Sequence, residues 1–260
     1  MSCLPSHGRV ACNLCYGVPV DFDRTRNEEG EWRITANPLA WGSENAEVVI
    51  LGFSKGPNAL GALATKSHNE IPFAGQRLAV AKILAHIGLI QPGSPEEIRR
   101  TLNHAIADTS GRFAWGSLIR CAVERRDSAE WKGSGGGMLD KFVATPFGRK
   151  VASNCVKRHL GNLPTKTKLV VLFGLGTKLG YVQAARRLIQ QSKPEAALCT
   201  MNEISYRDNT VIYTHVEHFA SQGRLIPEWL GLPNKNGGMP ERSRWGRMAQ
   251  DAVREAMMGA

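Results

Sequence analysis

Cysteines are the residues whose type and spacing most directly suggest chemistry in this chain. Cys12 and Cys15 form a C-x-x-C pair, and Cys121 and Cys155 follow far downstream. Six cysteines in 260 residues are too sparse for a disulfide scaffold, so a reducing compartment would keep them as thiols or metal ligands. The spacing therefore predicts either a metal site built from thiolates or unrelated buried thiols.

Strands and helices alternate in the pattern that must position these residues. Apolar runs rich in β-branched residues, typical of buried parallel strands, occupy 46–53, 168–174 and 210–215, with a weaker run at 113–121. Helical periodicity appears at 76–88, 95–107, 149–163, 178–191 and 243–258. We expect an α/β fold, a three-layer αβα sandwich around a short, mostly parallel four-stranded sheet. We expect one domain over 1–260, in which a Gly-rich insertion at about 124–148 forms a long mobile excursion.

Ligands of such sheets bind beyond the carboxyl ends of the strands, so the residues that follow each strand are the first candidates for a site. They are Gly52 to Gly56, Arg120 and Cys121, Gly174 to Gly176, and His215 to Ser221. Gly174, Gly176 and Gly180 resemble a dinucleotide fingerprint, but they follow a late strand and the nearest acid is Glu195. We therefore interpret them as a tight turn that packs a helix on the sheet.

Charge and composition narrow the classes of partner. The chain carries 33 Lys and Arg against 23 Asp and Glu, a formal net charge of +10, which favours a polyanion such as nucleic acid. With 42% hydrophobic residues the chain can bury a core, which excludes a disordered or collagen-like protein. It lacks an apolar run of about 18 residues and the apolar region of a signal peptide. We expect a soluble cytoplasmic monomer without a membrane partner.

Several segments, taken in order, resemble the uracil-DNA glycosylase superfamily, in particular its iron–sulfur microbial branch. Members of that branch show C-x-x-C, a G-E-A-P-G type loop, P-F-x-G, N-x-x-K-C, a helix near a fourth Cys, a strand ending in L-G, and H-P-S. The corresponding segments here, over 12–225, are Cys12 to Cys15, VVILGFSKGPN, Pro72 to Gly75, Ser117 to Cys121, ASNCVKRHL, KLVVLFGLG and VIYTHVEHFASQG.

The resemblance gives the cysteines a role. It implies that Cys12, Cys15, Cys121 and Cys155 hold a structural [4Fe-4S] cluster, with four-cysteine zinc as the alternative. Cys155 stands farther from Cys121 than the family usually shows, which leaves Cys3 as a substitute ligand.

The resemblance also implies a catalytic set for cleaving an N-glycosidic bond. Phe73 would stack on a base turned out of DNA, and His218, or else His215, would donate a hydrogen bond to the departing base. Family members usually place an Asp, Asn or Glu in the loop after the first strand to hold water, but Gly52 to Asn58 contains no carboxylate, so Asn58 or Glu70 would take that part, unless a backbone group does.

The base-binding set would comprise Phe73, Phe53, Ser54 and Ser117. Ser117 stands where the family has an Asn that reads uracil, and a hydroxyl presents fewer hydrogen-bonding groups than an amide. This departure favours a modified pyrimidine over uracil, for example a substituted cytosine of phage DNA.

DNA contacts are expected from cations and from a side chain that fills the gap left by the base. The candidates are Lys55, Gln222, Arg224 and Leu225, supported by basic residues at 120, 125, 126, 149, 150, 157, 158, 242, 244 and 247. Lys55 is also the one reservation against simple hydrolysis, because an amine can form a Schiff base.

These expectations describe a monofunctional DNA glycosylase that leaves an abasic site, in repair or in defence against modified foreign DNA. The alternatives are a uracil-DNA glycosylase of base-excision repair, a non-catalytic iron–sulfur DNA-binding protein, and a dinucleotide-dependent enzyme that uses the Gly174 loop.

Overall fold

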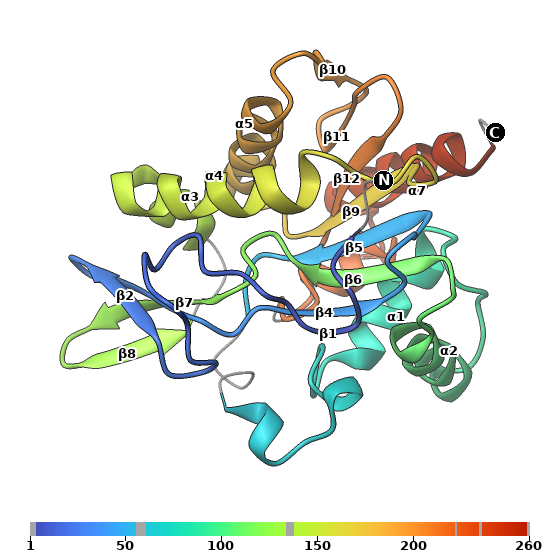
Figure 1. Cartoon of the computed structure of the whole chain (residues 1–260). Helices are drawn as coiled ribbons and strands as arrows, with labels where there is room; N and C mark the ends of the chain where they lie inside the picture. The colour runs from blue at the N-terminus through green and yellow to red at the C-terminus, as the bar shows by residue number, and fades with distance from the viewer. Residues whose placement is uncertain (1–3, 56–60, 134–137, 222, 234–235, 259–260) are drawn as a thin grey trace.

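Two β-sheets form the framework of the computed structural model, which describes residues 4–55, 61–133, 138–221, 223–233 and 236–258 (Figure 1). Within those residues the main sheet has eight strands, in the order β1 (Gly8–Arg9), β4 (Leu39–Gly42), β6 (Phe113–Ser117), β5 (Val48–Gly52), β9 (Leu169–Phe173), β12 (Ile212–Val216), β11 (Ser205–Arg207) and β10 (Cys199–Thr200). The second sheet is antiparallel, in the order β2 (Arg26–Glu29), β3 (Trp32–Thr35), β7 (Ala122–Asp127) and β8 (Glu130–Gly133).

The expected short, mostly parallel four-stranded sheet is therefore wrong. Only the central strands β6, β5, β9 and β12 pair in parallel; the described edge strands pair antiparallel on both sides. The central strands are apolar runs that are buried on both faces, as parallel strands are. The described edge strands are only two to four residues long, and β1 and β4 pair with strands far away in the sequence, so no long apolar run marks them.

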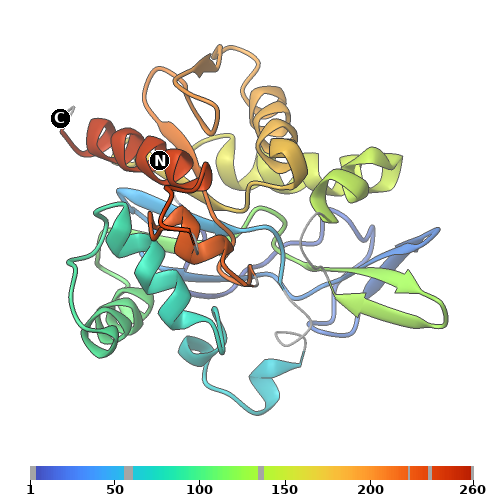
Figure 2. The same cartoon turned by 180° about the vertical axis from the view of Figure 1, so that it is seen from behind.

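Helices cover both faces of the main sheet (Figures 1 and 2). They are α1 (Arg77–His86), α2 (Pro95–Ala107), α3 (Met138–Ala144), α4 (Pro146–Leu160), α5 (Gly180–Ser192), α6 (Leu225–Trp229) and α7 (Arg242–Met258). Helices α4 and α5 lie on one face, and α1 and α7 lie on the other, where Gln250 donates to the carbonyl of His86. Among the described helices, none is both long and apolar enough to cross a bilayer.

The position of a site follows from this topology. The chain leaves β5 toward α1 on one face and leaves β9 toward α5 on the other. Adjacent parallel strands whose connections go to opposite faces open a crevice at their carboxyl ends, where ligands of α/β sheets bind. The loops after β5 and β9 are therefore the expected walls of a binding site.

The segment 124–148 is structured over most of its length, which corrects the expected mobile excursion. Its described residues form β7, β8, α3 and the start of α4. Many residues of these strands are charged, and pairing across the strands offsets the cost of burying them. Arg33 donates to both carboxylate oxygens of Glu124, at 2.9 and 2.6 Å, and its guanidinium stacks on the Trp131 ring. Charged residues in paired strands of this kind do not produce the apolar run by which strands are recognised.

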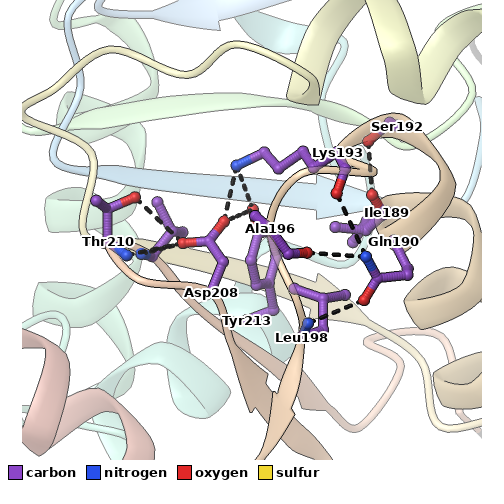
Figure 3. Close-up of polar contacts among 10 residues, drawn as sticks. Ile189, Gln190, Ser192, Lys193, Ala196, Leu198, Asp208, Thr210 and Tyr213 are labelled. Carbon is purple, nitrogen blue, oxygen red and sulfur yellow. Dashed lines mark hydrogen bonds and ion pairs between the residues drawn. The ribbon is translucent and has the colours of Figure 1, made fainter.

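A buried polar network stabilises the end of the sheet at β11 and β12 (Figure 3). Asp208 accepts hydrogen bonds from Lys193 at 2.8 Å, from the Tyr213 hydroxyl at 3.2 Å, and from the backbone of Thr210 and Val211 at 2.9 and 2.7 Å. The side chains of Lys193 and Asp208 are only 10% and 3% exposed. Burial favours the protonated form, but these hydrogen bonds hold the pKa of Asp208 below its ordinary value.

We expect Asp208→Asn to destabilise the fold by about 3–5 kcal/mol, because it leaves the Lys193 ammonium buried without its partner. Asp127→Asn is the matched control, since the Asp127–Lys132 pair is 60% and 61% exposed and water screens it, so its loss should leave the stability nearly unchanged. Urea unfolding measures both. The pKa of Asp208 is lower in the folded state than in the unfolded state. The stability that its ionised carboxylate gives to the fold is therefore present above the unfolded pKa of about 3.9 and is lost as pH falls through the folded pKa. Equal losses in the two variants would contradict this account.

Candidate functional site

A cavity of about 730 Å³ opens at the carboxyl ends of the four parallel strands. Its wall includes the segments that follow each of them, namely Gly52 to Lys55, Ser117, Phe173 to Lys178, and Glu217 to Ser221. Segments far apart in sequence complete it: Ile71 to Ala74, Met138 to Asp140, Tyr181 and Arg242. Cavities of roughly 300–1,000 Å³ are the size that holds small-molecule ligands.

Phe73 lies at the centre of an aromatic cluster in this wall. Its ring centroid is 5.1 Å from that of Phe219, 5.8 Å from Phe173 and 6.0 Å from Trp115. The backbone of Phe73 has φ of 56°, in the left-handed region that a bulky residue rarely adopts. Strained backbone of this kind persists only where its surroundings hold it, and such residues cluster at binding and active sites. The structure thus places the expected stacking platform in the cavity.

His218 shares that cavity with Phe73. Its ring stacks on Phe219 at 4.4 Å between centroids, and Nδ1 accepts a hydrogen bond from the backbone N–H of Ala220 at 3.1 Å. Burial lowers the pKa of His218, against the opposing effect of Glu217, so the ring is neutral near pH 7. Since the accepting Nδ1 carries no proton, the neutral ring carries its proton on Nε2. His218 therefore offers one N–H donor.

His215 is removed from the candidates for the reaction. It lies inside β12, is fully buried, and is absent from the described cavity wall. Its Nδ1 contacts the carbonyl of Gly174 at 3.0 Å, and its Nε2 contacts the Tyr206 hydroxyl at 3.3 Å. Burial lowers the pKa of His215 to about 4, so this histidine is a neutral structural side chain.

Glu70, one of the two expected water-holding residues, is not part of the described cavity wall. Glu70 lies in the 3-10 helix His68–Glu70, is exposed, and closes a capping box with Ser67, whose hydroxyl and backbone N–H donate to it at 2.6 and 2.8 Å. Glu70 is thus a helix cap outside the wall, which corrects its expected role. Asn58 lies outside the described residues.

The expected base-binding residues Phe53, Ser54 and Ser117 all line the cavity. Two backbone hydrogen bonds tie the ends of β5 and β6 together there: Leu118 donates to Gly52 at 2.8 Å and Ile119 donates to Phe53 at 2.9 Å. The Gly174 loop also lines the cavity, and at Gly176 a Cβ would meet the backbone nitrogen of Tyr181 at 2.5 Å. Glycine there permits the loop to pack closely on the start of α5.

Glu217 is a wall residue that lies in the candidate range His215 to Ser221 but received no role from the sequence. It is buried, and it accepts hydrogen bonds from the backbone N–H of His218 at 2.9 Å and from the Ser221 hydroxyl at 2.7 Å, while Arg242 on α7 pairs with its other oxygen. These contacts fix the loop that carries His218. Its place directly after β12 was the signal that could have identified it.

Asp140 on α3 and Tyr181 on α5 were missed. Both line the cavity, and no sequence pattern connects them to the strand ends. The helical spacing around each residue predicts only packing.

The four expected cysteine ligands lie within electrostatic reach of one another beside the second sheet. Burial raises the pKa of the Cys155 thiol, and the neighbouring thiols of Cys121, Cys15 and Cys12 raise it further. Asn154, next to Cys155 on α4, donates to the Cys15 sulfur at 3.6 Å. Cys3 lies outside the described residues, and among those described no group of three or more His, Cys, Asp or Glu is arranged to hold a single metal ion.

A buried cation faces these thiols. Arg120 is 3% exposed, and its Nε and Nη1 have no hydrogen-bond partner in the described part of the chain. Burial lowers the pKa of Arg120 to about 10, while Cys155 acts to raise it. An unpaired buried guanidinium is costly unless negative charge compensates it. Thiolates bound to a metal centre would supply that charge, so the residues present fit such a group.

The residues expected to contact DNA lie in different surroundings. Lys55 and Leu225 line the cavity, but Lys55 is buried and its ammonium donates to the carbonyl of Arg120. Arg224 is exposed and donates to the carbonyl of Pro233. Gln222 lies outside the described residues.

Several of the supporting cations are buried or already engaged in contacts within the protein. Arg120 is buried, Arg125 pairs with Glu31, Arg126 stacks on Trp131, and Arg244 pairs with Glu203. These four are therefore poor candidates for phosphate contacts.

We expect Phe73→Ala to slow base release by about 5- to 150-fold, since stacking of a base on an aromatic ring contributes about 1–3 kcal/mol. Phe22→Ala is a suitable control, because Phe22 packs under Arg9 away from the cavity wall. Single-turnover assays on one duplex substrate measure both variants. If Phe73→Ala released base as fast as the Phe22 control, Phe73 would not be the platform.

Comparison of the chain with protein-family models, with curated proteins and with solved structures finds no match. The likeness to the uracil-DNA glycosylase superfamily therefore depends on the motifs of the sequence.

Proposed function

We propose that this protein is a DNA glycosylase that takes a modified pyrimidine out of DNA into the cavity and hydrolyses its N-glycosidic bond. One observation carries the proposal: Phe73 and the N–H donor of His218 lie in one cavity at the carboxyl ends of the parallel strands. This pairing supplies a stacking surface and a donor, which are what recognition and release of a single base require.

The reaction breaks the bond between C1′ of the sugar and the base nitrogen, and the bonding electrons leave with the base. His218 donates its Nε2–H to a base oxygen on which this negative charge accumulates, and the proton stays on the ring. Water then adds to C1′, and its surplus proton passes to solvent or to the departed base. Glu217 acts as a positioning residue, because it holds the loop that aims the His218 ring.

Two features favour a modified base over plain uracil. Ser117 presents a single hydroxyl at the cavity wall where the similar family has an amide. In addition, about 730 Å³ is in the range suited to drug-sized ligands, whereas a bare pyrimidine is much smaller.

The cysteine site would serve the fold of this enzyme. Cys12, Cys15, Cys121 and Cys155 would hold a [4Fe-4S] cluster, for which four thiolates are the usual ligands. Bound there, the cluster would join the N-terminal segment to β7 and α4.

Hydrolysis without a covalent intermediate is the expected course. The side chain of Lys55 is buried, which lowers its pKa to about 7. However, its Nζ donates to the carbonyl of Arg120 and is therefore held within the protein instead of being free to attack a sugar carbon. Borohydride added during turnover should therefore trap no covalent protein–DNA adduct.

The test is incubation of the purified protein with a panel of natural and modified genomic DNAs, followed by mass spectrometry of the supernatant. We expect one free modified pyrimidine and a matching number of abasic sites in the DNA. DNA that changes mobility on binding while no base is released would show a non-catalytic binding protein instead. Fastest release of plain uracil would show a repair glycosylase.

A further inference from the structure

Two polar side chains in the cavity wall each have an oxygen without a hydrogen-bond partner in the described part of the chain. Tyr181 is 5% exposed, and its hydroxyl is buried without a partner among the described residues. Asp140 is partly buried, and its Oδ1 is also a buried atom without a hydrogen-bond partner among those residues. Both residues line the cavity, and Asp140 Oδ2 lies beside Gly180, the residue that precedes Tyr181 on α5, so Asp140 and Tyr181 are neighbours. Unpaired buried polar groups are costly, which makes each of them a place for a ligand group.

Surrounding residues hold these two side chains in place. At Gly180 a Cβ would lie 2.3 Å from Asp140 Oδ2, so the absence of a side chain at 180 leaves room for the carboxylate. The Tyr181 ring packs against His215 at 5.3 Å and faces Phe53 at 6.3 Å. The phenol therefore cannot easily turn away from the cavity.

The other described carboxylate in the wall differs from Asp140. Glu217 uses both oxygens for contacts with Arg242, Ser221 and the backbone of His218. Burial raises the pKa of Asp140, against the opposing effect of Arg187. Asp140 is thus the carboxylate whose Oδ1 remains for an incoming group.

The chemistry of the pair defines the group. A carboxylate only accepts hydrogen bonds, whereas a phenol both donates and accepts. Burial and the nearby carboxylate raise the pKa of Tyr181, so the phenol keeps its proton at neutral pH. A hydroxyl satisfies the pair by donating to Asp140 and accepting from Tyr181, and an amine does so by donating to both.

We propose that Asp140 and Tyr181 form a specificity subsite that binds a hydroxyl or amino group of the extruded base. This inference rests on the proposed function and narrows its substrate to pyrimidines that bring a hydrogen-bond donor to this part of the cavity.

The experiment uses duplexes that differ only at one cytosine, which carries hydrogen, methyl, hydroxymethyl or a glucosylated hydroxymethyl group at C5, and the uracil counterparts. Base release and equilibrium binding are measured for the wild-type protein, Asp140→Asn and Tyr181→Phe. Tyr181→Phe keeps the ring contacts, and Asp127→Asn, on the β7–β8 hairpin, is the control carboxylate. Thermal unfolding checks that each variant is folded.

We expect the wild-type protein to prefer donor-bearing bases, and Asp140→Asn to reduce that preference by about 10- to 100-fold, the scale of a hydrogen bond to a charged group. Release of the methyl base should change little. Loss of the hydroxymethyl-over-methyl preference identifies a hydroxyl, and loss of the cytosine-over-uracil preference identifies the amine. Equal effects on every base, or none, would overturn the subsite.

Binding separates this inference from the proposed function. A donor preference in binding that Asp140→Asn removes, with no base released by any protein, would refute hydrolysis and keep the subsite. Base release with unchanged selectivity in Asp140→Asn and Tyr181→Phe would support hydrolysis and refute the subsite.

Discussion

His218→Ala is expected to slow base release by about 100- to 1,000-fold, the usual cost of removing one donor to a developing negative charge. The donor is the Nε2–H, because Nδ1 accepts from the backbone of Ala220. DNA affinity should change only a few-fold, since the interaction strengthens only as the bond breaks. Single-turnover release and equilibrium binding on the same duplex measure the two effects.

His104→Ala provides the matched control for this prediction. His104 lies on an exposed face of α2, outside the described cavity wall, so its loss should leave release unchanged. A wild-type rate in His218→Ala would remove His218 from the mechanism. A similar loss in both variants would point to a general effect on the fold.

The second large effect concerns the cysteine site. Cys121→Ser should yield a protein without the brown colour and without the iron and sulfide of a cluster. Loss of this crosslink, taken on the scale of a lost disulfide, should cost about 2–5 kcal/mol, or about 4–20 °C in melting temperature. Visible absorbance, metal analysis and thermal unfolding provide the measurements.

Cys199→Ser is the control for the cysteine site, because Cys199 is exposed and stands apart from the four converging thiols. It should keep both the colour and the stability of the wild-type protein. Zinc in place of iron would support the alternative site with the same ligands. A metal-free wild-type protein, or a Cys121→Ser protein that keeps its iron, would contradict the assignment.

The central strands and the cavity between them were predictable, because both depend on local sequence. Val48–Gly52 and Leu169–Phe173 are unbroken apolar runs, and the residues after parallel strands meet at one edge of a sheet. That geometry predicts that Phe53, Ser117 and His218 lie near one another.

The second sheet was not predictable for a physical reason. Arg26–Glu29 and Glu130–Gly133 are short, charged strands. Buried charges such as Arg33 and Glu124 become acceptable only once they meet, and they are far apart in the chain. The periodicity of a short stretch of sequence cannot predict pairing between residues that are far apart in the chain.

The choice between the two histidines also needed coordinates. His215 is the fourth residue of β12 and therefore remains inside the sheet, whereas His218 lies past its end. A shift of the strand end by two residues would have changed which ring is buried. The pairing of Asp140 with Tyr181 could not be predicted from the sequence either, because their proximity arises from the packing of α3 on α5.

The most direct measurement is a crystal structure of the His218→Ala protein bound to a duplex that carries the preferred modified base. The account predicts the base turned out of the helix, its face against Phe73 and a carbonyl oxygen of the base directed at the position of the missing imidazole. A duplex that binds with this base still stacked, or with the base held elsewhere on the protein, would contradict the account.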